Sequence, residues 1–568
     1  MYALQTAKQD ALKVLKSSFG KKYSPSVDEL ETPPTSEMGD IAFPCFDVAK
    51  GMKKNPAELA SEIAAQVAAK GMIKKVEAKG PYVNFWIDRE KLAERVLKEV
   101  QTSGVRFGFS TQGNAKRIMV EYANLNTHKE VHIGHTRNMA LGQAVSNVLA
   151  AAGYNVIPLA YINDLGNNVA RCLWAYDKYH DGEIPEKGFE NEFFGKIYTE
   201  ATRKLEKSKT GLEEVSDIQR ELESGKGAWV KIWKKTNKWS LSGLKEVFDE
   251  FGLSLTKIYL ESEGLSDTKK IVEQIIKKGI AVHSEGAWVV RLEDEGLGVN
   301  LLVKSDGTHL YNAKDLALAK RKDEEYNPDR SIYVVDDRQK LVMEQLFATL
   351  KRMGFEKELY HLSYGMVTLP EGAMSSRKGN IVKYKDLRDG MIAFAKKETK
   401  KRHKDWEEKK LDEVSRVIAF AALKFSVLKT DPDKDVVFDM SEALSFEGFS
   451  GPYLLYTVAR CSSLLEKSND KPAKTITGLK EPQEHALVRE IAEFPNVIFK
   501  TAKDYQISRL AQYLFELGQA FNDFYAHVPV LSEEDESLRK SRLALVAATA
   551  QVMKNGLDIL GIQSIDEM

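Results

Sequence analysis

Residues 117–135 read R-I-M-V-E-Y-A-N-L-N-T-H-K-E-V-H-I-G-H, and this stretch decides the fold. It starts with a strand-like run, and a polar loop follows. The next run, T-R-N-M-A-L-G-Q-A-V-S-N-V-L-A-A-A-G-Y, has the apolar spacing of a long helix. A second apolar strand, N-V-I-P-L-A-Y-I, comes directly after it. Strand, helix and strand in this order predict a βαβ unit of a parallel sheet, with ligands at the carboxyl ends of its strands.

Two histidines flank a glycine where the loop meets the helix. The amino terminus of a helix presents free backbone N–H groups and a positive dipole end, which favour phosphate. Gly134 leaves room for a nucleotide, and the imidazoles of His132 and His135 can donate hydrogen bonds to phosphate oxygens. A lone histidine is more often a surface or core residue, but His-x-Gly-His rarely arises by chance. The motif therefore predicts a polyphosphate site.

Outward from this unit, the chain divides into three regions of a multidomain α/β protein. Residues 1–110 combine a helical pattern with the strand-like run P-Y-V-N-F-W-I and predict a separate α/β module. Residues 111–385 are expected to hold the parallel sheet, with a helical insertion at about 175–270. After the insertion, A-W-V-V-R-L, N-L-L-V-K and S-I-Y-V-V-D are expected to return to the sheet. Residues 386–568 have helical spacing almost throughout and predict an all-α bundle.

Composition sets limits on the class of protein. The chain has 568 residues, 43% hydrophobic and 29% charged, so it is long enough for several domains and gives no compositional case for disorder. Lys and Arg total 83 and Asp and Glu total 83, so bulk charge gives no support to nucleic-acid binding. Basic runs at residues 234–238 and 396–404 could supply a local patch or be solvated helix faces.

The cysteines and the apolar runs bear on metal binding and location. Cys45, Cys172 and Cys461 lie too far apart in the sequence to suggest a zinc knuckle or a disulfide framework, so no metal-ligating residue is predicted. The same usage fits a reducing compartment. No uninterrupted apolar run approaches the roughly 20 residues of a membrane span, and the first residues lack the pattern of a secretory signal. We therefore expect a cytoplasmic protein without a membrane partner.

The quoted stretch resembles class I aminoacyl-tRNA synthetases, whose first signature is His-x-Gly-His on a Rossmann-type fold. Its flanks, Glu-x₄-Asn before the histidines and Asn-Asp-x-Gly at residues 163–166, are similar to the arginine-specific branch. The resemblance implies an arginine–tRNA ligase, which uses ATP to activate L-arginine as arginyl-adenylate with release of pyrophosphate. It also implies transfer of arginine to the 3′-terminal adenosine of tRNA(Arg), help from Mg²⁺, and activation that waits for bound tRNA. We expect a monomer.

The second class I signature departs from the family pattern in this chain. The matching stretch is G-A-M-S-S-R-K-G-N at residues 372–380, with Ala373 and Ser376 where the two signature lysines would stand. Some arginine-specific members with an altered second signature carry a lysine three residues before the first histidine, and Lys129 occupies that place. The resemblance therefore implies that Lys129 stabilises the transition-state phosphate, helped by Arg377 or Lys378. The implied ATP site comprises His132, Gly134, His135, Met374, Ser375 and Ser376.

Recognition of arginine requires acidic acceptors, because guanidinium is a planar fork of donors that pairs with carboxylate. Tyr311 and Asp315 are spaced i and i+4, so on a helix they share one face. Alone, such a pair is more often an ordinary helix surface. The resemblance implies an arginine site made of Glu121, Asn124, Asn126, His135, Tyr311, Asp315 and Gln339.

Both ends of the chain resemble RNA-binding parts of the same family. The pieces M-G-D-I-A-F-P and G-P-Y-V-N-F are similar to the arginyl-specific extra domain at the tRNA elbow, which implicates Tyr82 and Asn84. The carboxyl-terminal region resembles the helical anticodon-binding domain. Aromatic faces commonly hold unpaired bases, which favours Tyr453 and Tyr456, with Tyr513 and Met568 as further candidates. Tyrosines at helical spacing are otherwise usually core residues.

Three other interpretations remain open. One is a class I synthetase for another amino acid, such as glutamate or cysteine, although cysteine–histidine metal spacing is missing from the sequence. A second is a catalytically silent RNA-binding or scaffold paralogue, which the missing signature lysines would suit. A third is a small adenylyltransferase-like enzyme that shares His-x-Gly-His, which the long helical carboxyl terminus disfavours. Charging assays with each amino acid discriminate among them.

Overall fold

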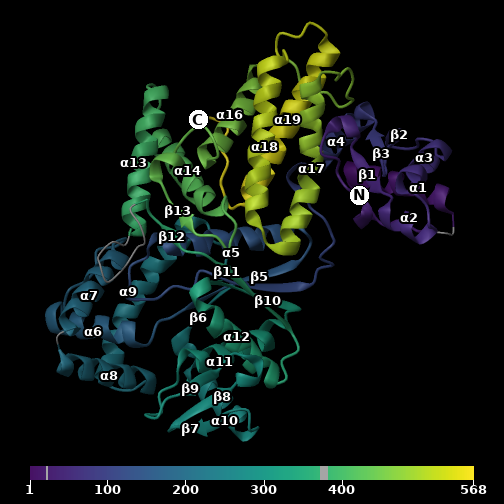
Figure 1. Cartoon of the computed structure of the whole chain (residues 1–568). Helices are drawn as coiled ribbons and strands as arrows, with labels where there is room; N and C mark the ends of the chain where they lie inside the picture. Colours follow the sequence, from purple (N-terminus) through teal and green to yellow (C-terminus); the bar gives the residue numbers. More distant parts are fainter. Residues whose placement is uncertain (21–22, 207, 371–381) are drawn as a thin grey trace.

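The amino-terminal part of the chain forms a small α/β module at one side of the molecule, drawn in purple in Figure 1. The computed structural model describes residues 1–20, 23–206, 208–370 and 382–568. The module has a three-stranded sheet of order β1-β3-β2, in which β3 pairs antiparallel with both neighbours. Its main elements are α1 (Ala3–Phe19), β1 (Ile41–Pro44), α3 (Pro56–Gln66), β2 (Ile73–Lys79), β3 (Tyr82–Ile87) and α4 (Arg89–Ser103).

The centre of the molecule is a five-stranded parallel sheet of order β11-β10-β4-β5-β6. The predicted strand–helix–strand unit is confirmed as β4, α5 and β5. Because β4 pairs with both β5 and β10, the strand order reverses between β4 and β10, and ligands of such sheets bind at this switch point. The bounds are β4 (Arg117–Glu121), α5 (Ile133–Ala151), β5 (Asn155–Ile162), β6 (Lys257–Leu260), β10 (Arg330–Asp336) and β11 (Glu358–Tyr364).

Four helices lie between β5 and β6, in the region expected to be an insertion. The strand β6 also falls inside the expected range 175–270, yet it belongs to the central sheet, where it pairs with β5. A strand of four residues next to charged segments gives too short an apolar pattern to be recognised. The helices are α6 (Asn167–Tyr179), α7 (Glu190–Leu205), α8 (Lys209–Ser224) and α9 (Ala228–Phe251).

Two of the three strands expected to return to the sheet do not do so. A-W-V-V-R-L and N-L-L-V-K form β8 and β9, which build a separate antiparallel sheet with β7. A hairpin between β7 and β8 makes the local pairing available, and apolar spacing does not specify a partner. S-I-Y-V-V-D is in the central sheet as β10. The elements here are α10 (Leu265–Lys277), β7 (Val282–Ser284), β8 (Ala287–Arg291), β9 (Val299–Val303), α11 (Tyr311–Tyr326) and α12 (Lys340–Arg352).

The carboxyl-terminal region is the predicted helical bundle, and α5 packs against its helices α14 and α17. The amino-terminal module docks on the same bundle (Figure 1), where Gln101 Nε2 donates to the Ala473 carbonyl at 2.8 Å. Among the described helices, none has the length and apolarity to cross a membrane. The bundle comprises α13 (Tyr384–Arg402), α14 (Glu408–Leu428), α16 (Gly451–Lys467), α17 (Pro482–Asp504), α18 (Ile507–His527) and α19 (Glu536–Ile559).

Candidate active site

The two signature histidines form a stacked pair at the start of α5. His132 precedes the helix, and its ring centroid lies 3.7 Å from that of His135 with 26° between the ring planes. The Gly134 N–H donates to His132 Nδ1 at 3.2 Å, and the His132 N–H donates to His135 Nδ1 at 3.1 Å. Because each Nδ1 accepts a hydrogen bond, the proton of each neutral ring sits on Nε2. The pair thus offers two Nε2–H donors.

Both imidazoles are neutral at physiological pH. Burial lowers the pKa of His132 to about 4, and the charges of Lys129 and Arg338 add to this effect. Burial, the neighbouring His132 and the Lys129 charge hold the pKa of His135 well below its ordinary value. A Cβ at Gly134 would lie 3.0 Å from His132 Cε1, so the glycine makes room for the stacked ring. The result is a pair of neutral donors at a helix amino terminus, which is suited to phosphate oxygens.

The loop before the histidines is anchored by His128. Its buried ring lies between two hydroxyls, Thr127 Oγ1 at 2.9 Å and Thr236 Oγ1 of α9 at 2.8 Å. Lys129 follows directly, with its Nζ 5.7 Å from the centroid of the Tyr198 ring on α7. Burial lowers the pKa of Lys129, because a poorly hydrated ammonium is less stable than a solvated one. The insertion helices therefore position a partly desolvated cation beside both histidines.

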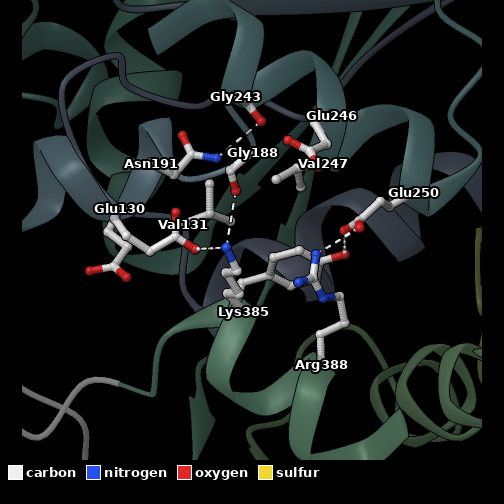
Figure 2. Close-up of a pocket in the computed structure, with 12 residues that line it drawn as sticks. Glu130, Val131, Gly188, Asn191, Gly243, Glu246, Val247, Glu250, Lys385 and Arg388 are labelled. Carbon is white, nitrogen blue, oxygen red and sulfur yellow. Dashed lines mark hydrogen bonds and ion pairs between the residues drawn. The ribbon is translucent and has the colours of Figure 1, made fainter. Parts of the chain in front are cut away.

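A second segment, residues 382–388, braces the same loop. The Ile133 N–H donates to the Val382 carbonyl at 3.1 Å, and the Tyr384 N–H donates to the Val131 carbonyl at 2.9 Å. Figure 2 shows how the insertion holds this segment: Lys385 Nζ donates to the Gly188 carbonyl at 3.0 Å. The predicted ATP and catalytic residues Met374, Ser375, Ser376, Arg377 and Lys378 lie outside the described residues.

Glu121 and Asn124 are joined at the carboxyl end of β4. Asn124 Nδ2 donates to Glu121 Oε1 at 3.0 Å, and Asn124 Oδ1 accepts from the Tyr161 N–H at 2.9 Å. The other oxygen, Glu121 Oε2, is paired with the buried Lys322. Asn124 thus holds the Glu121 carboxylate against the next strand, and the lysine neutralises that carboxylate.

Asp315 is the acidic group without a partner. In the part of the chain that the structure describes, its carboxylate has no hydrogen bond and no ion pair. Burial raises the pKa of Asp315 to about 7, and the nearby Glu121 contributes to the rise. Tyr311 begins the same helix and is close enough to couple electrostatically to Asp315. The structure therefore brings Glu121, Tyr311 and Asp315 together.

The remaining predicted arginine ligands lie at the same edge of the sheet. Asn126 forms a β-bridge with Asn163 just beyond the ends of β4 and β5. Gln339 is exposed and ends a short helical turn that follows β10. Neither assignment is tested by the contacts of the described residues, and both stay predictions.

The predicted RNA-binding residues differ in exposure. Asn84 and Tyr513 are 3% and 4% exposed, and the Tyr513 hydroxyl donates to the Glu490 carbonyl at 2.8 Å. Both side chains are therefore largely covered in this structure, and their roles in RNA binding stay predictions. Tyr82, Tyr453, Tyr456 and Met568 are partly exposed.

Sequence reasoning missed three charged groups of the site. Lys314 Nζ lies 2.5 Å from Glu261 Oε1, and both are buried, as Lys322 is. Lys322 stands seven residues after Asp315 on α11, a spacing that puts both on one helix face and could have revealed it. Glu261 lies in a short turn after β6 and carried no such signal.

Comparison with known proteins supports the same assignment along the chain. Family models match residues 4–87 (arginyl tRNA synthetase N terminal domain), 97–440 (tRNA synthetases class I (R), catalytic domain) and 454–568 (DALR anticodon binding domain). The arginine–tRNA ligase of Bdellovibrio bacteriovorus is 36% identical over 98% of each chain, and that of Treponema denticola is 35% identical over 96% of each. The arginyl-tRNA synthetase structure from Thermus thermophilus has a TM-score of 0.83 at 25% identity, covering 99% of this chain and 100% of that one.

The parallel sheet, the stacked histidines at the start of α5 and the helical carboxyl-terminal region define a class I aminoacyl-tRNA synthetase, an ATP-dependent ligase. The catalytic-domain model covers more than half of the chain, and the two bacterial relatives match nearly all of it. The chain belongs to the arginyl-tRNA synthetase family. The family resemblance and the multidomain fold predicted from the sequence are confirmed.

Proposed function

We propose that this arginine–tRNA ligase activates arginine at the switch point of the central sheet. The arginine carboxylate attacks the α-phosphorus of ATP in line, and pyrophosphate leaves. The Nε2–H groups of His132 and His135 donate to phosphate oxygens as negative charge develops, and Lys129 adds a positive charge. The observation that carries this proposal is the pair of neutral donors at the start of α5, on a chain whose relatives are arginine–tRNA ligases.

The arginine side chain is proposed to bind Asp315. Its carboxylate faces the end of β4 and has no partner among the described residues, so it is available to a guanidinium. Tyr311 at the start of the same helix completes this side of the site. Glu121, Asn126 and Gln339 are proposed to lie around the rest of the amino acid, and Asn124 is proposed to act by holding Glu121.

In the second step, the terminal adenosine of tRNA(Arg) enters and its 2′-hydroxyl attacks the adenylate carbonyl. No protein nucleophile is required, so catalysis consists of positioning and charge stabilisation. The match of residues 454–568 to an anticodon-binding model supports a contact between the bundle and the RNA. Tyr453 and Tyr456 are proposed to stack on bases. The roles of Tyr82, Asn84, Tyr513 and Met568 in RNA binding remain predictions, and for Asn84 and Tyr513 they require the covered side chain to become exposed.

Other features complete the proposal. Mg²⁺ is proposed to arrive bound to the ATP phosphates, since the described residues contain no cluster of three or more His, Cys, Asp or Glu suited to a metal.

We place the enzyme in the cytoplasm, where its three buried free cysteines would stay reduced. It is proposed to act as a monomer. We propose units of 1–110, 111–385 and 386–568.

The test is arginine-dependent exchange of pyrophosphate into ATP, measured with and without tRNA. We expect exchange only when arginine and tRNA are both present. Strong exchange without tRNA would remove the tRNA requirement but leave the activation chemistry standing. No exchange under either condition, with the RNA tightly bound, would instead favour a catalytically silent RNA-binding protein.

A further inference from the structure

Four carboxylates surround Tyr161 at the ends of β5 and β6, and three of them are satisfied by the protein. Asp164 accepts hydrogen bonds from the Ser262 N–H at 2.8 Å and from Asn237 Nδ2 at 3.0 Å. The two glutamates, Glu261 and Glu121, each pair with a buried lysine of α11. The fourth carboxylate, Asp315, comes from the same helix as these lysines and has no partner in the described ranges.

The two lysines are unusual because they are buried. Lys322 is 1% exposed and Lys314 is 6% exposed. Burial lowers the pKa of Lys322, but the adjacent Glu121 carboxylate and Tyr333 together outweigh this effect, and the net pKa is raised. Lys322 Nζ also lies 4.5 Å from the centroid of the Tyr333 ring on β10, which gives the cation a second favourable contact. A buried charge is retained only when its partner compensates for desolvation. Lys322 therefore neutralises Glu121, whereas Lys314 lies 2.5 Å from Glu261 Oε1 and 3.7 Å from Glu223 Oε1 and is shared between these two carboxylates.

We propose that Lys322 is a positioning and specificity-determining residue: by neutralising Glu121, it leaves Asp315 as the one carboxylate of these four without a hydrogen-bond or ion-pair partner among the described residues, so the site accepts one cationic side chain. This inference rests on the arginine site proposed above. Without Lys322, Glu121 and Asp315 would be two like charges close together in a poorly hydrated site. Such a pair shares a proton, and a neutral Asp315 cannot form an ion pair with guanidinium.

The proposal has a specific consequence for the pH dependence of binding. Below its pKa of about 7, Asp315 is protonated and binds arginine weakly, so affinity rises as the pH passes through this value. Arginine favours the ionised form and therefore displaces a proton on binding. The charged and titratable groups that face Asp315 come from five elements. They are Glu121 of β4, Tyr161 of β5, Glu261 of the turn after β6, Tyr333 of β10, and Tyr311, Lys314 and Lys322 of α11.

The experiment is calorimetric titration of the full chain with L-arginine between pH 5.5 and 9, in buffers of different ionisation enthalpy so that released protons are counted. For Lys322→Met, we expect the pH midpoint of arginine affinity to rise by about one unit or more, because a neighbouring positive charge is lost. The matched control is Lys320→Met, a half-exposed lysine of the same helix, and it should leave the midpoint unchanged. The double variant Glu121→Gln with Lys322→Met removes both charges and should return the midpoint close to the wild-type value.

The variant Asp315→Asn distinguishes failure of the proposed arginine site from failure of the role given to Lys322. If this variant binds arginine like the wild type, the proposed arginine site is wrong. If it loses binding while the Lys322→Met midpoint coincides with that of the wild type, only the role of Lys322 is wrong. Should Lys322→Met fail to fold because Glu121 is left unpaired, the double variant decides: a folded protein with a near wild-type midpoint supports the charge role. A double variant that also fails to fold would assign Lys322 to packing alone and overturn the inference.

Discussion

In the proposed mechanism, Lys129 supplies the positive charge on which the activation step depends most. It is coupled to both histidines, and its lowered pKa marks a site where a charge acts with little screening by water. We expect Lys129→Ala to reduce kcat for arginine-dependent exchange, measured with tRNA present, by about 100-fold or more, as for loss of one stabilising donor elsewhere. The KM for arginine should change little.

The matched control for this prediction is Lys196→Ala. Lys196 is exposed on α7, the helix that also carries Tyr198, and its loss should leave exchange unaffected. Lys129→Arg should retain part of the activity, since it keeps the charge. Full exchange activity in Lys129→Ala would defeat the role given to this lysine.

At the residue scale, sequence reasoning found the groups that stand in short motifs and missed those defined by burial. His132, Gly134 and His135 are adjacent in the chain, so their shared role could be predicted. The sequence does not reveal which ring nitrogen carries the proton, because that follows from the stacked geometry. Asn84 and Tyr513 matched family positions, but their burial depends on packing between distant segments.

At the element scale, the insertion helix α9 links the histidine loop to the first helix of the carboxyl-terminal region (Figure 2). Glu250, near the end of α9, accepts a hydrogen bond from the Tyr384 hydroxyl at 2.8 Å and pairs with Arg388 at 2.6 Å. Tyr384 in turn pairs through its backbone with Val131, next to His132. This chain of contacts gives the insertion a mechanical role in fixing the start of α5.

We therefore expect Glu250→Ala to weaken both stability and activity. Loss of this largely buried carboxylate leaves Arg388 without its partner on α9, which should lower the free energy of unfolding by about 3 kcal/mol in a denaturant titration. The kcat for exchange should fall, because loss of the Glu250–Tyr384 contact lets the loop that carries His132 and His135 shift. The KM for ATP should change less. Glu246→Ala is the control: this exposed residue of α9 lines the pocket drawn in Figure 2 together with Glu250, and its loss should be neutral. Equal effects of the two substitutions would contradict the account.

Helices and strands could be predicted wherever the pattern of apolar residues extended over many positions. The strand–helix–strand unit from β4 to β5 and the carboxyl-terminal helices have many turns or a continuous apolar run, so their type was clear. The four-residue β6 was too short, and β8 and β9 paired with each other instead of with the central sheet. Strand pairing depends on contacts far apart in the sequence, which single-sequence patterns do not contain.

At the scale of the whole molecule, the helical carboxyl-terminal bundle, which is expected to bind the RNA, contacts α5, the helix that begins at the two histidines. Lys424 of α14 donates to Gln143 Oε1 of α5 at 3.0 Å and to the Gly561 carbonyl at 2.5 Å. The amino-terminal module docks on the bundle, where Arg489 lies 3.0 Å from Asp40. The charges of the chain sum to zero, so RNA binding must depend on their local arrangement.

The most direct measurement is aminoacylation of total tRNA by the purified chain, with each labelled amino acid supplied in turn together with ATP and Mg²⁺. The account predicts that arginine is esterified to tRNA and that the other amino acids, including glutamate and cysteine, are not. Charging with a different amino acid, or tight binding of tRNA without charging by arginine, would contradict it.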